Sequence, residues 1–489
     1  MAKTATVLLG AAAVGAVGLY LVGPPISRSG SGIWPTFVSS EPNYDALEAH
    51  RARQRAEAPP VSAPSPAAAP INAGPVDPEP RAVEEGEAAL AAPDTERLAP
   101  LRSAAGYWPD FRGPVRDGHY TATPIRTDWP SDGLPELWKQ PIGLGYASIV
   151  VADGRAFTIE QRRDREVVAA YDVMTGLEVW THGWEGEFVE YQGGNGPRAT
   201  PTYHEGRLYA LGALGELRAL DAATGALVWR RNILDDAGAS NLDWGMAASP
   251  LVVDDTVVVL PGGRDGASVV AYDLDRGDQA WRALDDRQAY TSPMLVTLAG
   301  MRQILIVSAE RALGLTVDGE RVLWDHPWVT DFGINVAQPI LLGGDRVFLS
   351  AGYGHGAAVI EIVPDGSAFT ARTVWQNIRM KNRFSSSVFR DGYIYGLDES
   401  ILACVDAATG ELQWKGGRYG HGQILLAGDH LVVLSEDGDV VLVRATPERH
   451  EELARFHALD GRTWNHPVIA GGRLLVRNLR EMAAFDLRP

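Results

Sequence analysis

The chain has 489 residues, of which 45% are hydrophobic and 22% are charged, a composition typical of globular proteins. Its net charge of −18 repels phosphate backbones and anionic lipid surfaces, so no nucleic-acid partner is expected. The single cysteine, Cys404, excludes an intramolecular disulfide, a cysteine metal cluster and a CxxCH haem attachment. We expect Cys404 to be a small core residue.

The first predicted element is a membrane anchor. Residues 4–23 are an uncharged stretch rich in Ala, Val, Leu and Gly, and a helix of that length spans about 30 Å, one bilayer core. Lys3 precedes the stretch and Arg28 is the first basic residue after it. This asymmetry predicts a single-pass helix in the cytoplasmic membrane, with the rest of the chain in the periplasm or outside the cell. A cleaved signal peptide is the alternative, although Pro24 and Pro25 disfavour cleavage at the end of the stretch.

Residues 24–106 are predicted to be a disordered linker. Residues 45–57 within it are predicted to form a short charged helix, and residues 58–80 are dense in Pro and Ala. Such a composition buries too little apolar surface to offset the loss of chain entropy on folding. We therefore expect a semi-extended tether that carries the folded body away from the bilayer.

From residue 107 onward the chain repeats. Four segments align without gaps: AYDVMTGLEVW (170–180), ALDAATGALVW (219–229), AYDLDRGDQAW (271–281) and CVDAATGELQW (404–414). Weaker copies end at Trp138, Trp324 and Trp375. The tryptophans of all these copies recur at intervals of roughly 40 to 50 residues, a period that indicates a propeller blade or a helical repeat.

The content of each period favours the propeller. Tight turns such as Asp153-Gly154 and Asp391-Gly392 separate β-rich runs, as hairpins require. The repeated Asp-x-x-Thr-Gly is turn chemistry, because Asp caps turns and Gly accepts a positive φ. The Trp then lies on the following strand, where it can pack between adjacent blades. Four strands in each period make a propeller blade.

Eight blades are predicted, with inner strands that begin near Ala147, Ala199, Ala248, Ser292, Ala337, Ser386, Gln423 and Pro467. The last blade contains only three strands, so residues 134–141, around Trp138, are expected to supply the fourth and leave no open sheet edge. Seven blades is the alternative, because the segment after Trp414 lacks the Asp-Gly-Trp signature.

The repeat A-x-D-x-x-T-G-x-x-x-W resembles the tryptophan-docking repeat of the pyrroloquinoline quinone-like propellers. This superfamily includes the quinoprotein alcohol dehydrogenases and the propeller subunit of the outer-membrane β-barrel assembly machinery. Residues 107–118, YWPDFRGPVRDG, are similar to the W-P-x-F-R-G-P opening of exported or membrane-linked bacterial members. The resemblance covers about residues 107–489 and implies an all-β propeller domain over that range.

The same resemblance sets a test for dehydrogenase activity. Quinoprotein dehydrogenases typically carry an adjacent Cys pair, a Ca²⁺ held by carboxylate and amide oxygens, and a nearby Asp base. This chain has one cysteine, and neither the Ca²⁺ ligands nor the base can be assigned. His182, His204, His355 and His421 fall in different blades, so no zinc site is expected. The sequence therefore assigns no catalytic and no metal-binding residue.

Ligands of propellers usually bind at a mouth of the central channel, where the residues just before each inner strand project. In this chain those positions are polar or aromatic: Tyr146, Arg198, Trp244, Tyr290, Asn335, Lys381, Arg383, His421, Asn465 and His466. Arginine side chains could fork onto the carboxylates of a flat anionic molecule such as a carboxylated quinone, and Trp244 could supply a stacking face. The alternative is a solvated structural channel without a ligand.

Two functions follow from these observations. The first is a non-catalytic, membrane-tethered binding or scaffold protein that binds an envelope protein or polymer and needs no cofactor. The alternative is a dehydrogenase of alcohols or sugars, or a quinone sensor, that holds pyrroloquinoline quinone with Ca²⁺ through Arg198, Lys381 and Arg383. A cofactor site requires these residues and Trp244 to converge in one cavity, whereas an exposed apolar patch would mark a partner surface.

Overall fold

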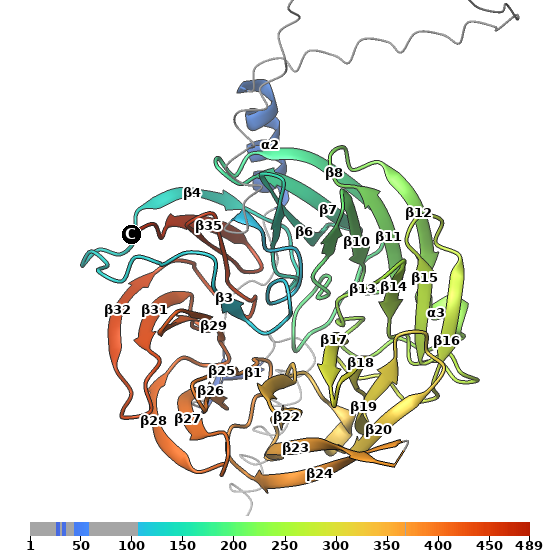
Figure 1. Cartoon of the computed structure of the whole chain (residues 1–489). Helices are drawn as coiled ribbons and strands as arrows, with labels where there is room; N and C mark the ends of the chain where they lie inside the picture. Colours follow the sequence, from blue (N-terminus) through green and yellow to red (C-terminus); the bar gives the residue numbers. More distant parts are fainter. Residues whose placement is uncertain (1–25, 30–31, 36–43, 58–105, 367) are drawn as a thin grey trace, which may run out of the picture.

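The computed structural model describes residues 26–29, 32–35, 44–57, 106–366 and 368–489. Eight β-sheets are arranged like blades around a central axis and form a disc (Figure 1). Residues 4–23, the predicted anchor, lie outside the described residues. None of the helices that the structure describes is long and apolar enough to cross a membrane.

Each blade contains four antiparallel strands that lie side by side in order from the axis to the rim. Blades 1 to 4 consist of β5 (Val150–Ala152), β6 (Arg155–Arg162), β7 (Arg165–Asp172) and β8 (Glu178–Glu185); β9 (Thr202–His204), β10 (Arg207–Leu211), β11 (Glu216–Asp221) and β12 (Leu227–Asn232); β13 (Leu251–Val253), β14 (Thr256–Val259), β15 (Val269–Asp273) and β16 (Gln279–Ala283); and β17 (Met294–Leu298), β18 (Met301–Val307), β19 (Arg311–Thr316) and β20 (Val322–Pro327).

The other four blades follow the same order. Blades 5 to 8 consist of β21 (Ile340–Gly343), β22 (Arg346–Ala351), β23 (Gly356–Asp365) and β24 (Ala368–Asn377); β25 (Val388–Arg390), β26 (Tyr393–Asp398), β27 (Ile401–Asp406) and β28 (Leu412–Arg418); β29 (Gln423–Ala427), β30 (His430–Leu434), β31 (Asp439–Arg444) and β32 (Glu452–His457); and β33 (Val468–Ala470), β34 (Arg473–Arg477), β35 (Glu481–Asp486) and β4 (Glu136–Pro141). The remaining elements are β1 (Ile26–Ser29), β2 (Gly32–Pro35), helix α2 (Tyr44–Glu57), β3 (His119–Tyr120), helix α3 (Ile233–Ala237) and the 3₁₀ turn η4 (Asp331–Gly333).

The predicted blade count and ring closure are confirmed. Strand β4 comes from the N-terminal side of the propeller and pairs antiparallel with β35, with Trp138 opposite Ala484. This pairing completes blade 8 and joins the two ends of the propeller, so blade 8 has its fourth strand and the ring is closed. The short β3 adds to the axial side of blade 7 by parallel pairing with β29.

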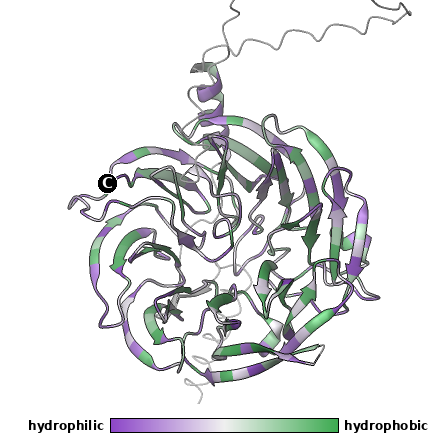
Figure 2. Cartoon of the chain, viewed as in Figure 1, coloured by the Kyte–Doolittle hydropathy of each residue, from purple (hydrophilic) through white to green (hydrophobic). Residues whose placement is uncertain are grey.

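The core lies between neighbouring blades. Middle strands such as β7 and β34 are buried on both faces, and this explains their continuous apolar sequence. Side chains from two blades interdigitate there; for example, Ile159 and Val168 of blade 1 share one cluster with Leu208 and Leu220 of blade 2. Outer strands alternate between buried and exposed residues, and Figure 2 shows purple stretches along them, whereas the inner strands are mostly green.

In the blades that carry it, the Asp-x-x-Thr-Gly motif forms the turn before the outer strand, as predicted. In blade 1 the Asp172 carboxylate accepts hydrogen bonds from the backbone N–H groups of Met174 and Thr175 and from the Thr175 hydroxyl. Gly176 then has a φ of +69°, which favours glycine. A Cβ atom on Gly176 would lie 2.6 Å from the Trp138 ring, so glycine also leaves the room in which the indole of the preceding blade packs.

The predicted packing of Trp between blades is confirmed. The Trp138 Nε1 donates to the Val173 carbonyl of the next blade at 3.1 Å. The same bond recurs from Trp180 to Ala222, Trp229 to Leu274, Trp375 to Ala407 and Trp414 to Thr446. Trp324 differs, because its Nε1 donates to Gln303 within its own blade at 2.6 Å.

Near the axis, hydroxyl groups connect the starts of the inner strands. The Ser148 N–H donates to the Thr200 hydroxyl at 2.9 Å, the Thr200 N–H to the Ser249 hydroxyl at 3.1 Å, and the Ser249 N–H to the Ser292 hydroxyl at 2.9 Å. Thr200, Ser249 and Ser292 each precede a proline. The Ser-Pro and Thr-Pro starts therefore link successive blades around the channel.

Candidate functional site at the central channel

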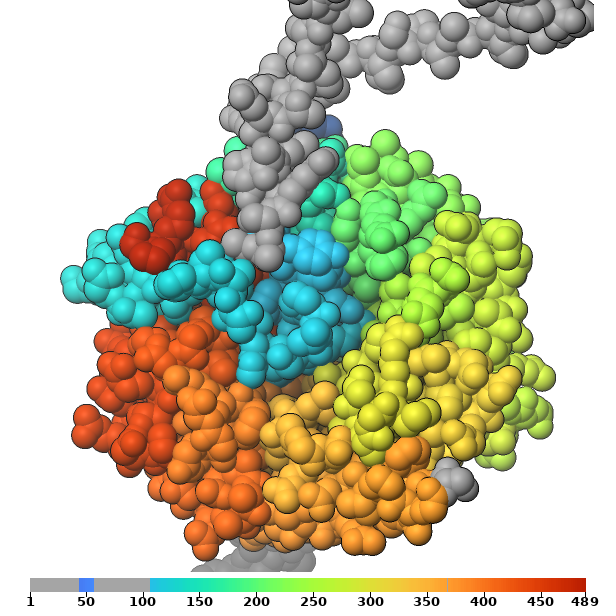
Figure 3. All heavy atoms as spheres, viewed as in Figure 1, coloured from blue at the N-terminus to red at the C-terminus, as the bar shows by residue number. Residues whose placement is uncertain are grey.

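One end of the channel is closed by residues 107–118, called here the plug segment. Trp108 exchanges two backbone hydrogen bonds of 2.8 Å with Val151 on the inner strand of blade 1, and its side chain is buried. Figure 3 shows the N-terminal part of the propeller lying over the centre of this face. We call it the plugged face. The opposite face, the loop face, carries the connections from each outer strand to the next inner strand.

Arg116 inserts into the channel from the plug segment. Its guanidinium donates to the carbonyls of Ser249, Pro250 and Pro293, which precede the inner strands of blades 3 and 4. The Asp110 carboxylate lies 2.8 Å from the guanidinium. Burial raises the pKa of Asp110, whereas the charge of Arg116 opposes that rise. Arg116 therefore joins two blades and the plug segment through charged hydrogen bonds.

Arg112 makes the equivalent connection on the other side of the channel. It donates to the Ser387 carbonyl at 2.7 Å and to the Asp117 carbonyl at 3.0 Å, and its Nη1 lies 3.4 Å from the His466 Nε2. Burial lowers the pKa of His466 to about 3, and the positive charge of Arg112 adds to the effect. His466 was predicted at the mouth, but it lies against the plug segment as a neutral side chain.

The mouth on the loop face is filled by aromatic side chains. The Trp464 ring is stacked on Tyr146 with centroids 5.2 Å apart, and it packs against Phe384 at 4.8 Å. Phe384 comes from the loop before blade 6 and Tyr146 from the loop before blade 1. Because these loops belong to blades three apart in a ring of eight, the three rings meet across the mouth. We call these rings, with Arg198, Arg383 and His421, the mouth cluster.

Arg383 is held by its own neighbours in this cluster. Its guanidinium lies 4.5 Å from the Tyr353 ring centroid and 5.9 Å from that of Phe384, and its Nε lies 3.6 Å from the Glu399 carboxylate. Its Nη1 is 3.4 Å from the His421 Nε2. Burial lowers the pKa of His421, so the ring is neutral beside the guanidinium at pH 7.

Arg198 stabilises a loop. It donates to the carbonyls of Gly194 and Gly196 at 2.8 and 2.7 Å, and its guanidinium lies 4.9 Å from the Phe188 centroid and 5.6 Å from the Tyr146 centroid. Trp244 lies close by, because a Cβ atom on Gly193 would be 3.2 Å from the Arg198 Nη2 and 3.3 Å from the Trp244 Cδ1.

Tyr290 completes this side of the mouth. Its ring packs edge-on against Trp244 with centroids 5.7 Å apart, and burial raises its pKa to about 12. Tyr290 therefore stays protonated and neutral over the physiological pH range.

The other predicted residues have structural contacts. The Lys381 ammonium lies 2.5 Å from the Asp398 carboxylate and donates to the Ile378 carbonyl. The Asn335 amide donates to the Ser308 carbonyl at 2.8 Å, and the Asn465 amide donates to the Ala147 carbonyl at 2.9 Å. These side chains fix loops to strands. A cofactor site would require Arg198, Trp244, Lys381 and Arg383 in one cavity, but these four residues lie in different surroundings. Arg198 and Trp244 flank one glycine, Arg383 belongs to the aromatic stack, and Lys381 is bound to Asp398.

Phe384 and Trp464 were missed in the sequence. Both directly adjoin predicted positions, since Phe384 follows Arg383 and Trp464 precedes Asn465. An aromatic residue shortly before the start of an inner strand is the signal that could have found them. Successive side chains alternate between the two faces of a sheet only within a strand. In a loop the sequence therefore does not indicate which of two adjacent residues points inward.

The model of the family described as outer membrane protein assembly factor BamB matches residues 164–416 of this chain. The chain belongs to this family. Among solved structures, BamB from Moraxella catarrhalis is 16% identical, with a TM-score of 0.51 over 72% of this chain and 98% of that one. The quinohemoprotein alcohol dehydrogenase ADHIIG from Pseudomonas putida HK5 is 13% identical, with a TM-score of 0.53 over 81% and 82%. The computationally designed protein Ika8 is 10% identical, with a TM-score of 0.52 over 72% and 100%.

These likenesses concern the fold alone, because all three identities are low. No curated protein sequence matches the chain. The BamB-type family and the quinohemoprotein thus share one propeller architecture with this chain.

The mouth cluster can be compared with what a carboxylated quinone needs. A flat quinone stacks in a slot between two faces, but in this BamB-type propeller the protein's own Trp464 occupies the space between Tyr146 and Phe384. The cations that could bind its carboxylates are held by Glu399, Asp398 and backbone carbonyls. Within the described ranges, no group of three or more His, Cys, Asp or Glu side chains is placed to hold a metal ion. In this arrangement the mouth cluster leaves no slot for a flat quinone between Tyr146 and Phe384.

Proposed function

We propose that the protein is a non-catalytic binding protein of the cell envelope. In this proposal the N-terminal segment tethers it to the cytoplasmic membrane, and the propeller outside the cytoplasm binds another envelope protein or a polymer. Membership of a family described as an outer membrane assembly factor supports a binding role in the envelope. The protein's own side chains occupy the channel mouth, which supports a rigid disc whose loops do the binding.

The observation that carries the proposal is a set of exposed apolar side chains on the loop face. Phe332 is 82% exposed and Val329 is 65% exposed on the loop between blades 4 and 5, and Ile378 is 69% exposed on the next loop. Tyr191, also 82% exposed, lies on the loop between blades 1 and 2. The loops of blades 4 to 6 are successive, so their apolar tips lie on one side of the face.

The conformation of Phe332 supports a binding role for this loop. Its φ is +66°, which is unfavourable for a bulky side chain, and the Arg287 guanidinium donates to its carbonyl at 3.3 Å. The chain therefore holds an aromatic ring in water at a cost in backbone energy. Strained residues that persist at the surface are concentrated at functional sites, and aromatic anchors dominate the energy of protein interfaces.

Site-specific photocrosslinking in intact cells tests this proposal. A photoreactive amino acid replaces Phe332 or Ile378 in one set of full-length variants. In the matched control it replaces Val115, which is 64% exposed on the plugged face. We expect one envelope component to crosslink to Phe332 and Ile378 but not to Val115. Equal crosslinking at all three positions, or none on the loop face, would contradict the proposal.

A further inference from the structure

Helix α2 lies at the rim of the disc, beside β4 of blade 8 and the strands of blade 1 (Figure 1). Leu47, His50, Arg51, Gln54 and Arg55 recur at the spacing of one helical face. Leu47 and Arg51 are buried, at 4% and 2% exposure. Arg51 is thus one of the most deeply buried cations of the chain, although it lies in a short helix outside the propeller sequence.

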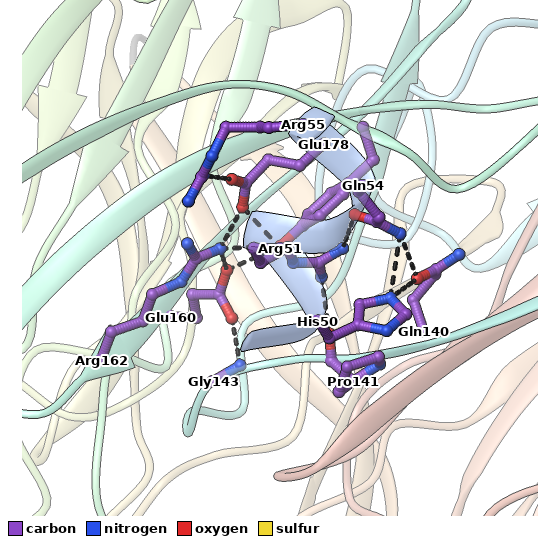
Figure 4. Close-up of polar contacts among 11 residues, drawn as sticks. His50, Arg51, Gln54, Arg55, Gln140, Pro141, Gly143, Glu160, Arg162 and Glu178 are labelled. Atoms are coloured by element: carbon purple, nitrogen blue, oxygen red, sulfur yellow. Dashed lines mark hydrogen bonds and ion pairs between the residues drawn. The ribbon is translucent and has the colours of Figure 1, made fainter. Parts of the chain in front are cut away.

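The first set of contacts is with β4. The Arg51 Nη2 donates to the Pro141 carbonyl at 2.6 Å. The Gln140 Oε1 lies 2.6 Å from the His50 Nε2 and accepts a hydrogen bond of 2.7 Å from Gln54. Figure 4 shows these side chains of α2 pointing into the seam between the helix and blade 8. The helix is therefore held by hydrogen bonds between specific polar atoms and not only by buried apolar surface.

The second set is with blade 1. The Arg51 Nε lies 3.6 Å from the Glu178 carboxylate, and the Arg51 guanidinium lies 4.9 Å from the Tyr171 ring centroid. Arg55 lies 3.5 Å from the same carboxylate. The Arg163 side chain of blade 1 donates in return to Asp45 at 2.6 Å and to Glu48 at 2.8 Å, near the start of the helix.

The electrostatics of the seam favour a cation from the helix. Glu160 and Glu178 have side chains 0% and 8% exposed, and both lie 2.6 Å from the single guanidinium of Arg162. Burial alone would raise the pKa of Glu160, but Arg162, Arg477 and Arg51 outweigh it and hold the pKa below its usual value. Buried carboxylates need compensating charge, and Arg51 provides part of it.

We propose that the seam formed by β4 and blade 1 is a binding site for a helix with an arginine-bearing face, and that helix α2 of the same chain is its occupant. The helix has 14 residues, a length at which an isolated helix is marginal in water, so the seam contacts order it. Residues 58–105 connect it to the propeller. A connection of that length gives an effective concentration near the millimolar range, which favours the helix of the same chain over that of a second copy.

Docking changes the reach of the tether, a consequence that rests on the proposed membrane attachment. With α2 bound, only residues 24–43 join the predicted anchor to the disc, whereas the free linker comprises residues 24–106. Fully extended, these segments span about 70 Å and about 290 Å respectively. The docked helix thus holds the rim of blades 8 and 1 within a quarter of the distance that the free linker permits.

Hydrogen exchange of the full-length chain in detergent tests the docking. We compare Arg51→Ala with Arg53→Ala, because Arg53 is exposed on the same helix and both changes alter helix propensity equally. We expect the amides of α2 to exchange about tenfold faster in Arg51→Ala and to match the native chain in Arg53→Ala. Equal exchange in the two variants would overturn the proposal.

Two further measurements test whether the bound helix comes from the same chain and whether docking shortens the tether. Protection that disappears on dilution from about 50 µM to about 0.5 µM would assign α2 to a second copy and overturn the proposal. For the tether, a dye on Glu185→Cys reports energy transfer to labelled lipids, since Cys404 is buried and unreactive. We expect transfer to fall in Arg51→Ala. A chain that does not enter the bilayer would refute the proposed membrane attachment and the shortened tether, while the exchange data would still decide the docking.

Discussion

Replacing Arg116 by Met is expected to destabilise the propeller strongly. The substitution keeps apolar bulk but removes the charged hydrogen bonds to Ser249, Pro250 and Pro293. It also leaves the Asp110 carboxylate, in a residue only 8% exposed, without its cation. Breaking a buried ion pair from one side costs about 3 to 5 kcal/mol. For a propeller that spans positions 107–489, the unfolding entropy is about 0.8 kcal/mol/K, so the melting temperature should fall by about 4 to 6 °C.

Differential scanning calorimetry measures this loss against a matched control. Arg302 forms an equally short pair with Asp254, at 2.7 Å, but the two side chains are 47% and 57% exposed. Arg302→Met is therefore expected to cost less than about 1 kcal/mol. Adding Asp110→Asn to Arg116→Met should recover part of the loss, because no buried charge then remains. If Arg116→Met shifts the melting temperature no more than Arg302→Met does, the plug segment does not hold the blades together as argued.

Three further changes test other parts of the fold. Trp229→Phe removes the 2.8 Å bond to the Leu274 carbonyl and should cost about 1 to 3 kcal/mol in denaturant unfolding; a loss within error would show that the inter-blade bond is dispensable. Burial lowers the pKa of His466 to about 3, so its stabilising effect is complete above pH 6.5 and is lost as pH falls toward 3; His466→Gln should flatten the acid limb of a melting curve against pH. Burial raises the pKa of Glu166 to about 7, so stability falls as pH rises from about 4.5 to 7, by at most about 1.4 kcal/mol per pH unit. Glu166→Gln should remove that slope, and an unchanged slope would show that Glu166 is ionised in the folded protein.

The fold was largely predictable because each repeat contains the residues that determine its local structure. The spacing of the Trp residues, the Asp-x-x-Thr-Gly turn and the Ser-Pro starts are each local in sequence, and each determines one local structure. Even the closure of blade 8 by Trp138 followed from a missing strand. Trp324 is an exception, because it bonds Gln303 in its own blade; its segment is one of the weaker copies, and the repeat does not indicate this partner.

The site was less predictable because it consists of loops that meet across the channel. Arg198, Trp244, Tyr290, Arg383 and His421 lie at the mouth, as their positions before the inner strands indicated. Which of them face one another depends on loop geometry, which has no periodicity. Phe384 and Trp464, which the sequence did not predict as site residues, also fill the mouth.

The partners of helix α2 were also not predictable, because they lie far from the helix in the sequence. A short charged helix was expected near Asp45, and the structure contains it. Its partners Gln140, Glu160 and Glu178 lie on β4, β6 and β8, which follow the helix only after the whole of the Pro- and Ala-rich segment. A contact at such a separation leaves no local pattern, so the burial of Arg51 could not be anticipated.

We propose that the protein's own side chains fill the channel mouth and that no quinone binds there. Titration of the full-length chain in detergent with pyrroloquinoline quinone and Ca²⁺, followed by tryptophan fluorescence, tests it most directly, because Trp464 lies within the mouth cluster. We expect no saturable quenching up to concentrations of about 100 µM, well above the dissociation constants of tight, specific sites. Saturable quenching at micromolar concentrations that Arg383→Ala abolishes would contradict it and favour the dehydrogenase.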